Sequence, residues 1–529
     1  MPSCDLPPQN NKRSALWGFL LVSLSLALHI KHLPYAEDDA YIHMRIARNL
    51  WATGLPYFNH DEPVMASTAP LWLLITAPAA ILGTYQPVGV AFLNVVVLTI
   101  ASLVWGLVFS NLARRSASAP HLGALSLSFV TLAPSSISLM ETPFAMMLTG
   151  TAYLGVIRKK WWGIPAITLA PFVRPECVVF AAILILYRLC SRRPWSIFEI
   201  TASLVPAGLM GAFELYFFGS VVPHTAHVKD VVYDISAAEF VRFFCLGSYG
   251  SLITKNILPF SATLVGVGLI ALIRSLNLKR YNLRLGEVRA HIGELPCMYF
   301  ILAPAVIIFV LYAIKHVLIF PWYTPLVLLP VHLGCLSLLR NRSFSARLVS
   351  LSLLFPLLSL AALLAGSCIR PELSPFFESG ARARQLRFLG TFVYSVFPGA
   401  RVLAPEIGAF GFSFKGPIID AIGLVSPEAV DFHPLKVPEE RATGFLGSVP
   451  VAFVEKEKPE IMVGLKTFFA HVLTTDITHD YDIIERPAMC EEDRLRALNP
   501  SVFGSQEILI FRRKGLAGPY GTDISTTSP

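Results

Sequence analysis

Long uninterrupted apolar runs constrain this chain more than any other feature. Residues 88–110 read VGVAFLNVVVLTIASLVWGLVFS, without a single charged residue, and a helix needs about 20 apolar residues to cross a bilayer. Similar runs recur along the first two thirds of the chain. Only 15% of the 529 residues are charged, against roughly 25% in a typical soluble domain. We therefore predict a mainly α, polytopic transmembrane helical bundle.

The apolar runs predict about eleven spans within residues 1–369. They lie near residues 14–31, 88–110, 121–138, 142–157, 161–173, 177–190, 198–218, 256–274, 297–315, 318–338 and 346–367. Residues 70–83 are also apolar, but runs of 10–14 residues are often interfacial or re-entrant. We expect this segment to lie on the membrane surface or to dip into it.

The positions of Lys and Arg predict the orientation of the spans, because loops that stay in the cytoplasm carry an excess of both residues. Basic clusters occur at residues 12–13, 114–115, 158–160, 188–193, 274–289 and 340–347. Placing all six clusters in the cytoplasm makes the spans alternate. The N-terminus is then cytoplasmic, the first helix is a retained span rather than a cleaved signal peptide, and the C-terminal part lies outside a cytoplasmic (inner) membrane.

The last 160 residues have a different composition. Residues 370–529 carry 17 Lys and Arg against 20 Asp and Glu, whereas residues 1–369 carry 26 against 15. The basic excess thus belongs to the membrane part and gives no reason to expect nucleic-acid binding. Short apolar runs at 401–404, 460–464 and 507–512 predict strands, and a helical pattern surrounds Ala497. We predict a soluble α/β domain over 370–514 and a disordered tail over 515–529.

The first outer loop, residues 32–69, holds the strongest chemical signal. Asp38 and Asp39 stand directly before a helical pattern. Acidic residues stabilise a helix N-terminus, so one interpretation is a capped interfacial helix. The other is a carboxylate at the membrane surface that deprotonates an acceptor hydroxyl. Asp39 is the better capping candidate, which leaves Asp38 as the predicted base and Asp39 as the alternative.

Several motifs resemble one enzyme superfamily. The first loop reads DDAYIHMRIARNL, then GLPYFN, then VMASTAPLW. Further motifs follow in order: LMETPFAMML at 139–148, FVRPE at 172–176, YFFGSVVPHTAHVK at 216–229, FPWYTPLVLLP at 320–330 and LAPEIGAFGFSFKGPIIDAIGLVSP at 403–427. Together they resemble polytopic GT-C glycosyltransferases, and most closely the group that includes the terminal arabinofuranosyltransferases.

The resemblance implies an inverting membrane glycosyltransferase. Its donor would be a sugar on polyprenyl phosphate; the analogy suggests arabinofuranose, and a hexose or an amino sugar stays open. Its acceptor would be an extracytoplasmic glycan, lipid or protein, and its catalytic acid residue would come from the first outer loop. The sequence departs from the family where Gly-Tyr usually precedes Thr-Ser-Pro, because residues 66–70 read ASTAP. This difference affects the loop on the substrate side.

Cations in the outer loops are candidates for binding the donor phosphate. Arginine suits phosphate because it forms bidentate hydrogen bonds. We predict this role for Arg174, Lys229, His224 and Arg45. For Arg174 an ion pair with Glu176 is an equal alternative.

Four further residues are candidates for substrate binding: Glu141, Tyr41, Trp322 and Tyr323. Glu141 could orient a hydroxyl or help to bind a divalent metal. The spacing of His224 and His227 alone is too weak to assign a metal site, so no metal ligand and no cofactor are assigned.

The main alternative is a transporter or flippase of lipid-linked sugars. Such a protein should show internal repeats and charged groups near the membrane centre. No clear repeat is present, and the polar groups gather at one face. An O-antigen ligase would share the donor class but should lack the first-loop pattern. No Walker loop, HExxH or nucleophile elbow occurs, which argues against an ATP-driven pump or a membrane protease.

Overall fold

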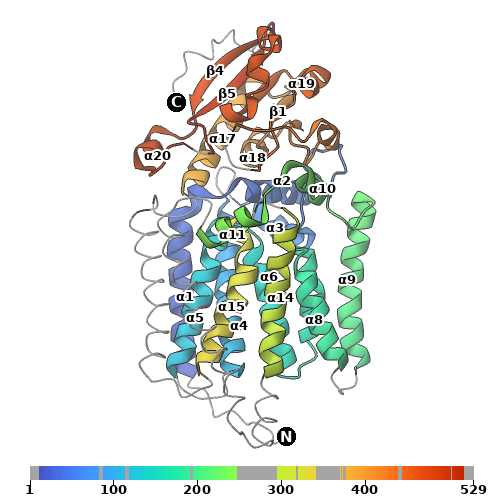
Figure 1. The fold of residues 1–529 in the computed structure, drawn as a ribbon, viewed down its shortest axis with the longest axis vertical. Coiled ribbons are helices and arrows are strands. Elements are labelled where there is room, and N and C mark those ends of the chain that lie inside the picture. Colours follow the sequence, from blue (N-terminus) through green and yellow to red (C-terminus); the bar gives the residue numbers. More distant parts are fainter. Residues whose placement is uncertain are drawn as a thin grey trace, which may run out of the picture.

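The computed structural model describes residues 11–82, 87–112, 118–190, 195–246, 295–316, 318, 320–340, 370, 372, 377–438, 444–501 and 503–516. Helices run along the long axis of the molecule, and a smaller unit with a β-sheet, the tail (residues 377–516), covers one end of them (Figure 1). The predicted spans at 256–274 and 346–367 lie outside the described residues. So do residues 517–529 of the predicted disordered segment.

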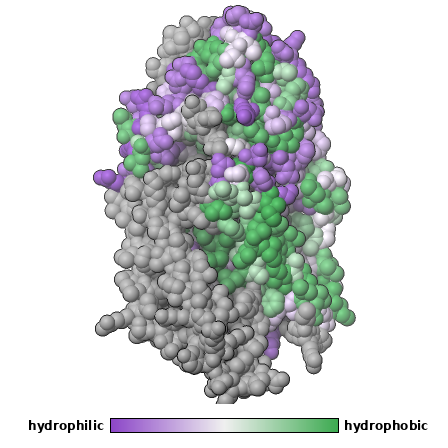
Figure 2. Space-filling model, viewed as in Figure 1, coloured by the Kyte–Doolittle hydropathy of each residue, from purple (hydrophilic) through white to green (hydrophobic). Residues whose placement is uncertain are grey.

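The bundle is built from the helices that the apolar runs predict. They are α1 (Asn11–His32), α4 (Val88–Leu112), α5 (Ser118–Ile137), α6 (Thr142–Ile157), α7 (Gly163–Leu169), α8 (Cys177–Cys190), α9 (Ile197–Phe218), α14 (Leu295–Ile314) and α15 (Pro325–Arg340). Apolar side chains dominate the described part of the bundle on the face that Figure 2 shows, and polar ones the tail. This distribution fits a bundle that lipid surrounds.

The number of spans stays a prediction. Among the described helices, α4 and α9 are long and apolar enough to cross a membrane unaided, and the bent pair of α1 and α2 (Asp38–Thr53) would add a third. Seven further apolar helices are 10 to 17 residues long. One of them is α3 (Pro70–Ala80), the segment predicted to be too short to span, which packs against α2 and α4.

A sharp corner places the first loop across the end of the bundle. α1 continues into the 3₁₀-helix η1 (Leu33–Tyr35). The axis of the segment Gly18–Tyr35, which combines the two, makes an angle of 92° with the axis of α2. α2 therefore lies between the bundle and the tail (Figure 1). It ends at Gly54, which adopts the left-handed conformation (φ 77°) that glycine tolerates best. The corner leaves the first residues of α2 facing the junction.

The tail contains a five-stranded sheet in the order β2-β1-β3-β5-β4. β1 pairs in parallel with β2 and β3, whereas β5 is antiparallel to β3 and β4. The strands are β1 (Val402–Ala404), β2 (Ile418–Asp420), β3 (Ile461–Leu465), β4 (Tyr481–Pro487) and β5 (Glu507–Arg513). β1, β3 and β5 match the predicted strands, and α20 (Glu491–Arg496) ends directly before Ala497.

The tail and the bundle share one hydrophobic core. A continuous cluster of buried apolar side chains runs from the bundle helices through α2 into α17 (Phe377–Val396), α18 (Gly408–Phe414) and the sheet. α2 packs directly against α17 and α18. The tail is thus packed onto the first loop rather than tethered loosely to the bundle, and any site at the end of α2 has residues of the tail in its walls.

Candidate active site

A cavity of about 170 Å³ lies at the junction of the first loop, the bundle and the tail. Its lining comes from segments that are far apart in the sequence, including the start of α2, the turn before α6, α10 (His224–Val232), η4 (Pro321–Tyr323) and the start of α17. Seven of the residues predicted from the sequence line it: Asp38, Asp39, Glu141, Arg174, Lys229, Trp322 and Tyr323. The fold thus gathers most of the predicted site in one place.

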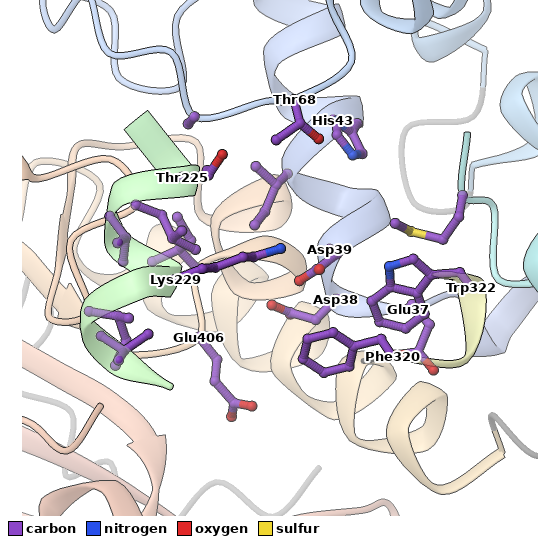
Figure 3. A pocket seen from close by; sticks show the side chains of 18 of the residues that line it. Glu37, Asp38, Asp39, His43, Thr68, Thr225, Lys229, Phe320, Trp322 and Glu406 are labelled. Atoms are coloured by element: carbon purple, nitrogen blue, oxygen red, sulfur yellow. The ribbon is translucent and has the colours of Figure 1, made fainter. Parts of the chain in front are cut away.

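Asp39 and Lys229 face each other across this cavity. Figure 3 shows the Lys229 side chain extending from α10 towards Asp39. No described group hydrogen-bonds the Asp39 carboxylate. Burial raises the pKa of Asp39, and the charge of Lys229 opposes that rise. Lys229 Nζ also donates a hydrogen bond to Tyr323 Oη at 2.8 Å. The pair combines a carboxylate that is free to accept a proton with a cation held in place beside it.

Thr225 adds a second donor on the same helix face as Lys229, because residues four apart lie on one side of a helix. Both residues line the cavity, and Figure 3 shows both on α10. The Thr225 hydroxyl is buried and has no hydrogen-bond partner among the described residues. A cation with an adjacent unpaired hydroxyl suits a phosphate group.

The neighbouring carboxylate of Asp38 is already engaged. Its two oxygens accept hydrogen bonds from the backbone N–H groups of Gly408 at 3.1 Å and Ala409 at 2.8 Å, at the start of α18. The sequence predicts Asp39 as the cap of α2 and Asp38 as the freer group, and this is wrong. Glu37 is the N-cap residue and makes no capping bond, while Asp38 connects the first loop to the tail.

A substitution at Gly408 tests this connection. A Cβ at residue 408 would lie 1.9 Å from the Asp38 carbonyl oxygen and 2.7 Å from Asp38 Oδ2. We therefore expect Gly408→Ala to push α18 away from α2, to lower the melting temperature of the purified protein and to make the tail easier to cleave with a protease. Gly399→Ala is the matched control, because a Cβ there meets nothing within 4 Å. Equal melting temperatures for the two variants would contradict the tight contact.

Arg174 forms a buried network instead of an open phosphate site. Its guanidinium bonds to Glu141 Oε1 at 2.7 Å and to Glu176 Oε1 at 2.9 Å, and it lies 4.1 Å above the Tyr323 ring. The side chains of Arg174 and Glu141 are only 4% and 2% exposed. Two carboxylates therefore balance one cation. Of the two alternatives for Arg174, the structure shows the ion pair with Glu176.

His43 joins this network from α2. Its Nε2 lies 3.5 Å from Glu141 Oε2, and its Nδ1 lies 2.9 Å from the Ser67 hydroxyl. Burial lowers the pKa of His43. A neutral imidazole is consistent with a guanidinium nearby, and Glu141 Oε2 has no hydrogen-bond partner among the described residues.

Three predicted residues do not line the cavity. Arg45 is buried against the tail, where it donates to the carbonyl oxygens of Gly411 and Gly416 at 2.6 and 2.7 Å. His224 Nε2 lies 3.0 Å from the Gly423 carbonyl oxygen. Tyr41 packs its ring on Phe412 of α18. The sequence places all three on the correct side of the bundle, but their side chains hold the tail in position, which the sequence did not reveal.

Other cavity residues were missed by the sequence analysis: Glu37, His43, Ser379, Arg382 and Glu406. Glu37 adjoins the two aspartates, so its position offered a signal. The last three belong to the tail, and no local pattern marks them. Burial raises the pKa of Glu37 to about 7.

Within the described ranges, no group of three His, Cys, Asp or Glu side chains is arranged to hold a metal ion. Glu141, the residue considered for a divalent metal, is occupied by Arg174. Metal binding stays one of the two roles that the sequence leaves open for Glu141, without an assigned set of ligands.

The fold matches that of a solved protein structure. No protein-family model matches the sequence, and no curated protein matches it. The structure aligns with ArnT from Cupriavidus metallidurans in the apo state with a TM-score of 0.53 and 13% identity, covering 96% of this chain and 100% of that one.

Two weaker similarities accompany it. ArnT bound to undecaprenyl phosphate aligns with a TM-score of 0.47 and 15% identity over 95% of this chain and 99% of that one. The arabinofuranosyltransferase AftD from Mycobacteria aligns with a TM-score of 0.45 and 15% identity over 85% of this chain and 35% of that one. The chain therefore shares the fold of apo ArnT, and the motifs of its first loop resemble those of GT-C glycosyltransferases.

Proposed function

We propose that this protein transfers a sugar from a polyprenyl-phosphate donor to an acceptor at the membrane face that carries the tail. The observation that carries this proposal is the cavity between bundle and tail, in which the unpaired carboxylate of Asp39 faces Lys229. A lipid-linked donor keeps its chain in the bilayer and its phosphate at the interface. A cavity at the end of an apolar bundle suits a substrate of this kind.

In this proposal Asp39 is the general base. It takes the proton of an acceptor hydroxyl while the hydroxyl oxygen forms a bond to the anomeric carbon of the donor sugar. The bond from that carbon to the phosphate oxygen breaks, and polyprenyl phosphate leaves with the electron pair. One displacement of this kind inverts the anomeric centre. The motif resemblance favours arabinofuranose as the sugar.

Lys229 and Thr225 bind the donor phosphate in this proposal. The ammonium group offsets the negative charge that develops on the leaving phosphate, and the unpaired hydroxyl of Thr225 donates a second hydrogen bond. Arg174 takes a different role, because Glu141 and Glu176 already balance its charge. Its guanidinium packs on the Tyr323 ring, and the Tyr323 hydroxyl accepts a hydrogen bond from Lys229.

The experiment uses membranes of a strain in which the gene has been deleted. These membranes should accumulate the polyprenyl-phospho-sugar donor together with unmodified acceptor. Adding the purified protein should convert the donor to polyprenyl phosphate and add one sugar to the acceptor, both measured by mass spectrometry. A transporter would leave the donor chemically unchanged. Donor that stays intact with active, folded protein would therefore exclude the transferase.

The proposal places the tail on the extracytoplasmic side, as the basic clusters indicate. A reporter that is active only in the cytoplasm should be silent when it is fused after Pro529. A reporter fused to a cytoplasmic control protein of similar abundance gives the reference signal. A bright Pro529 fusion would place the cavity on the wrong face for an extracytoplasmic acceptor.

Lys229→Met should change the dependence of the rate on pH. Asp39 must be ionised to act as a base, so the rate rises as pH increases through its pKa. Burial raises this pKa and Lys229 holds it down, so the variant should shift the acidic limb of the profile to higher pH. Lys466→Met is the control, because its exposed ion pairs lie in the tail away from the cavity. An unshifted limb would remove Lys229 from the surroundings of the base.

A further inference from the structure

We propose that the tail side of the cavity forms a subsite for the acceptor, made by Glu37, Ser379, Arg382 and Glu406, and that it takes a neutral, hydroxyl-rich saccharide. The inference rests on the proposed function and specifies the class of acceptor that it uses. All four residues line the cavity.

The fold brings these four side chains together from distant segments. Ser379 of α17 donates a hydrogen bond to Glu37, which lies more than 300 residues earlier in the chain. Arg382, one turn after Ser379, forms an ion pair with Glu406 in the loop between β1 and α18. The charge of Arg382 also acts on Glu37. Arg382 thus connects two carboxylates that border the same space.

One oxygen of this cluster lacks a partner. The Glu406 side chain is 9% exposed, and its Oε2 is buried without a hydrogen-bond partner among the described residues. A buried carboxylate oxygen that accepts no hydrogen bond costs free energy. An acceptor hydroxyl in the cavity could donate the missing bond.

An aromatic ring completes this end of the cavity. Phe503 lies 4.6 Å from the Arg382 guanidinium, and Phe445 and Phe468 line the cavity elsewhere, where Phe445 packs on Tyr233. A sugar ring combines hydroxyl groups at its edge with apolar C–H faces. Carboxylates beside aromatic rings complement both features, as ligand sites with an apolar lining and a few fixed polar groups do.

Charge decides between neutral and charged acceptors. Glu406 balances the charge of Arg382, and Asp38, Asp39 and the partly ionised Glu37 add negative charge around the same cavity. An anionic sugar would meet like charges at this end of the cavity, whereas a cationic sugar would meet the buried guanidinium. A neutral polyol avoids repulsion both by the carboxylates and by the guanidinium.

The position of the subsite also suits the chemistry. Glu37 lies two residues before Asp39, and Figure 3 shows it across the two aspartates from Lys229, whereas Glu406 lies below Lys229. An acceptor held at Glu37 would present a hydroxyl to Asp39 from the side away from the phosphate-binding lysine. An inverting displacement requires this arrangement, because the attacking and leaving oxygens lie on opposite faces of the anomeric carbon.

Saturation-transfer NMR on the full chain in lipid nanodiscs tests the subsite without donor. The probes are methyl β-glucopyranoside, which is neutral, and methyl β-glucopyranosiduronic acid, which is anionic at pH 7. We expect the neutral probe to bind at least about tenfold more tightly. Glu406→Gln should weaken its binding about tenfold, because hydrogen bonds to charged groups are stronger than neutral ones.

Two further variants keep the test sharp. Ser379→Ala removes one hydroxyl and should weaken the neutral probe severalfold without disturbing the Arg382 ion pair. Glu485→Gln, an exposed carboxylate of β4, should leave binding unchanged. Equal binding of the two probes, or unchanged binding in both Glu406→Gln and Ser379→Ala, would overturn the subsite. If the protein binds the neutral probe but does not consume the donor, the proposed sugar transfer is contradicted and the saccharide subsite is not.

Discussion

Asn in place of Asp39 should lower sugar transfer about 10²–10⁴-fold, the usual contribution of a general base. The substitution keeps the shape of the side chain and removes the group that accepts the proton. No described residue hydrogen-bonds this carboxylate, so the folded protein loses no bond. The measurement is the rate of polyprenyl-phosphate release in membranes of the deletion strain, with the amount of folded protein determined by size-exclusion chromatography.

The neighbouring residue is the matched control. Asp38→Asn keeps one oxygen for the backbone N–H groups of Gly408 and Ala409 but loses the second acceptor. We expect a lower melting temperature and a smaller loss of rate, because Asp38 acts through the position of α18. A dead, stable Asp38→Asn beside an active Asp39→Asn would reverse the two roles. Normal rates in both variants would remove the first loop from catalysis.

Arg174→Ala should destabilise the protein severely, by about 3–5 kcal/mol, the range measured when one partner of a buried ion pair is removed. Glu141 and Glu176 would remain as carboxylates without their cation, and Tyr323 would lose the guanidinium that lies above its ring. The measurement is thermal unfolding of the purified protein in detergent. Weak expression or a melting temperature far below that of the wild type is the expected result.

Arg401→Ala is the comparison for this variant. Arg401 forms an equally short ion pair with Glu457, at 2.6 Å, but its side chain is 52% exposed. Exposed pairs contribute about 0–1 kcal/mol, so this change should leave the melting temperature almost unaltered. A stable Arg174→Ala protein with weakened donor binding would restore the role in phosphate binding that the sequence suggested.

Arg45 and Arg174 have different roles in the folded protein, for a physical reason. Arg45 and Arg174 were both candidates for phosphate binding from the sequence, since both were predicted to lie in outer loops. In the folded chain Arg45 donates hydrogen bonds to the carbonyl oxygens of Gly411 and Gly416. Arg174 forms ion pairs with two carboxylates. Lys229 is the predicted cation that faces Asp39 in the cavity.

Local pattern was sufficient for the features that depend on neighbouring residues. Runs such as Val88–Leu112 are too apolar for water over a whole helix, so the bundle could be predicted without tertiary information. Acidic residues before a helical pattern marked the start of α2, and short apolar runs marked β1, β3 and β5. Together with the first-loop motifs, these features led to the fold and to seven of the residues that line the cavity.

Tertiary structure alone decided the role of each side chain. Asp38 and Asp39 are adjacent and chemically identical, and what separates them is α18, some 370 residues later, whose N–H groups bind only Asp38. Ser379, Arg382 and Glu406 carry no local signal, because the first loop that gives them a shared cavity is more than 300 residues away. Hydrogen bonds and burial at such separations arise only when the 92° corner before α2 brings the tail onto the bundle.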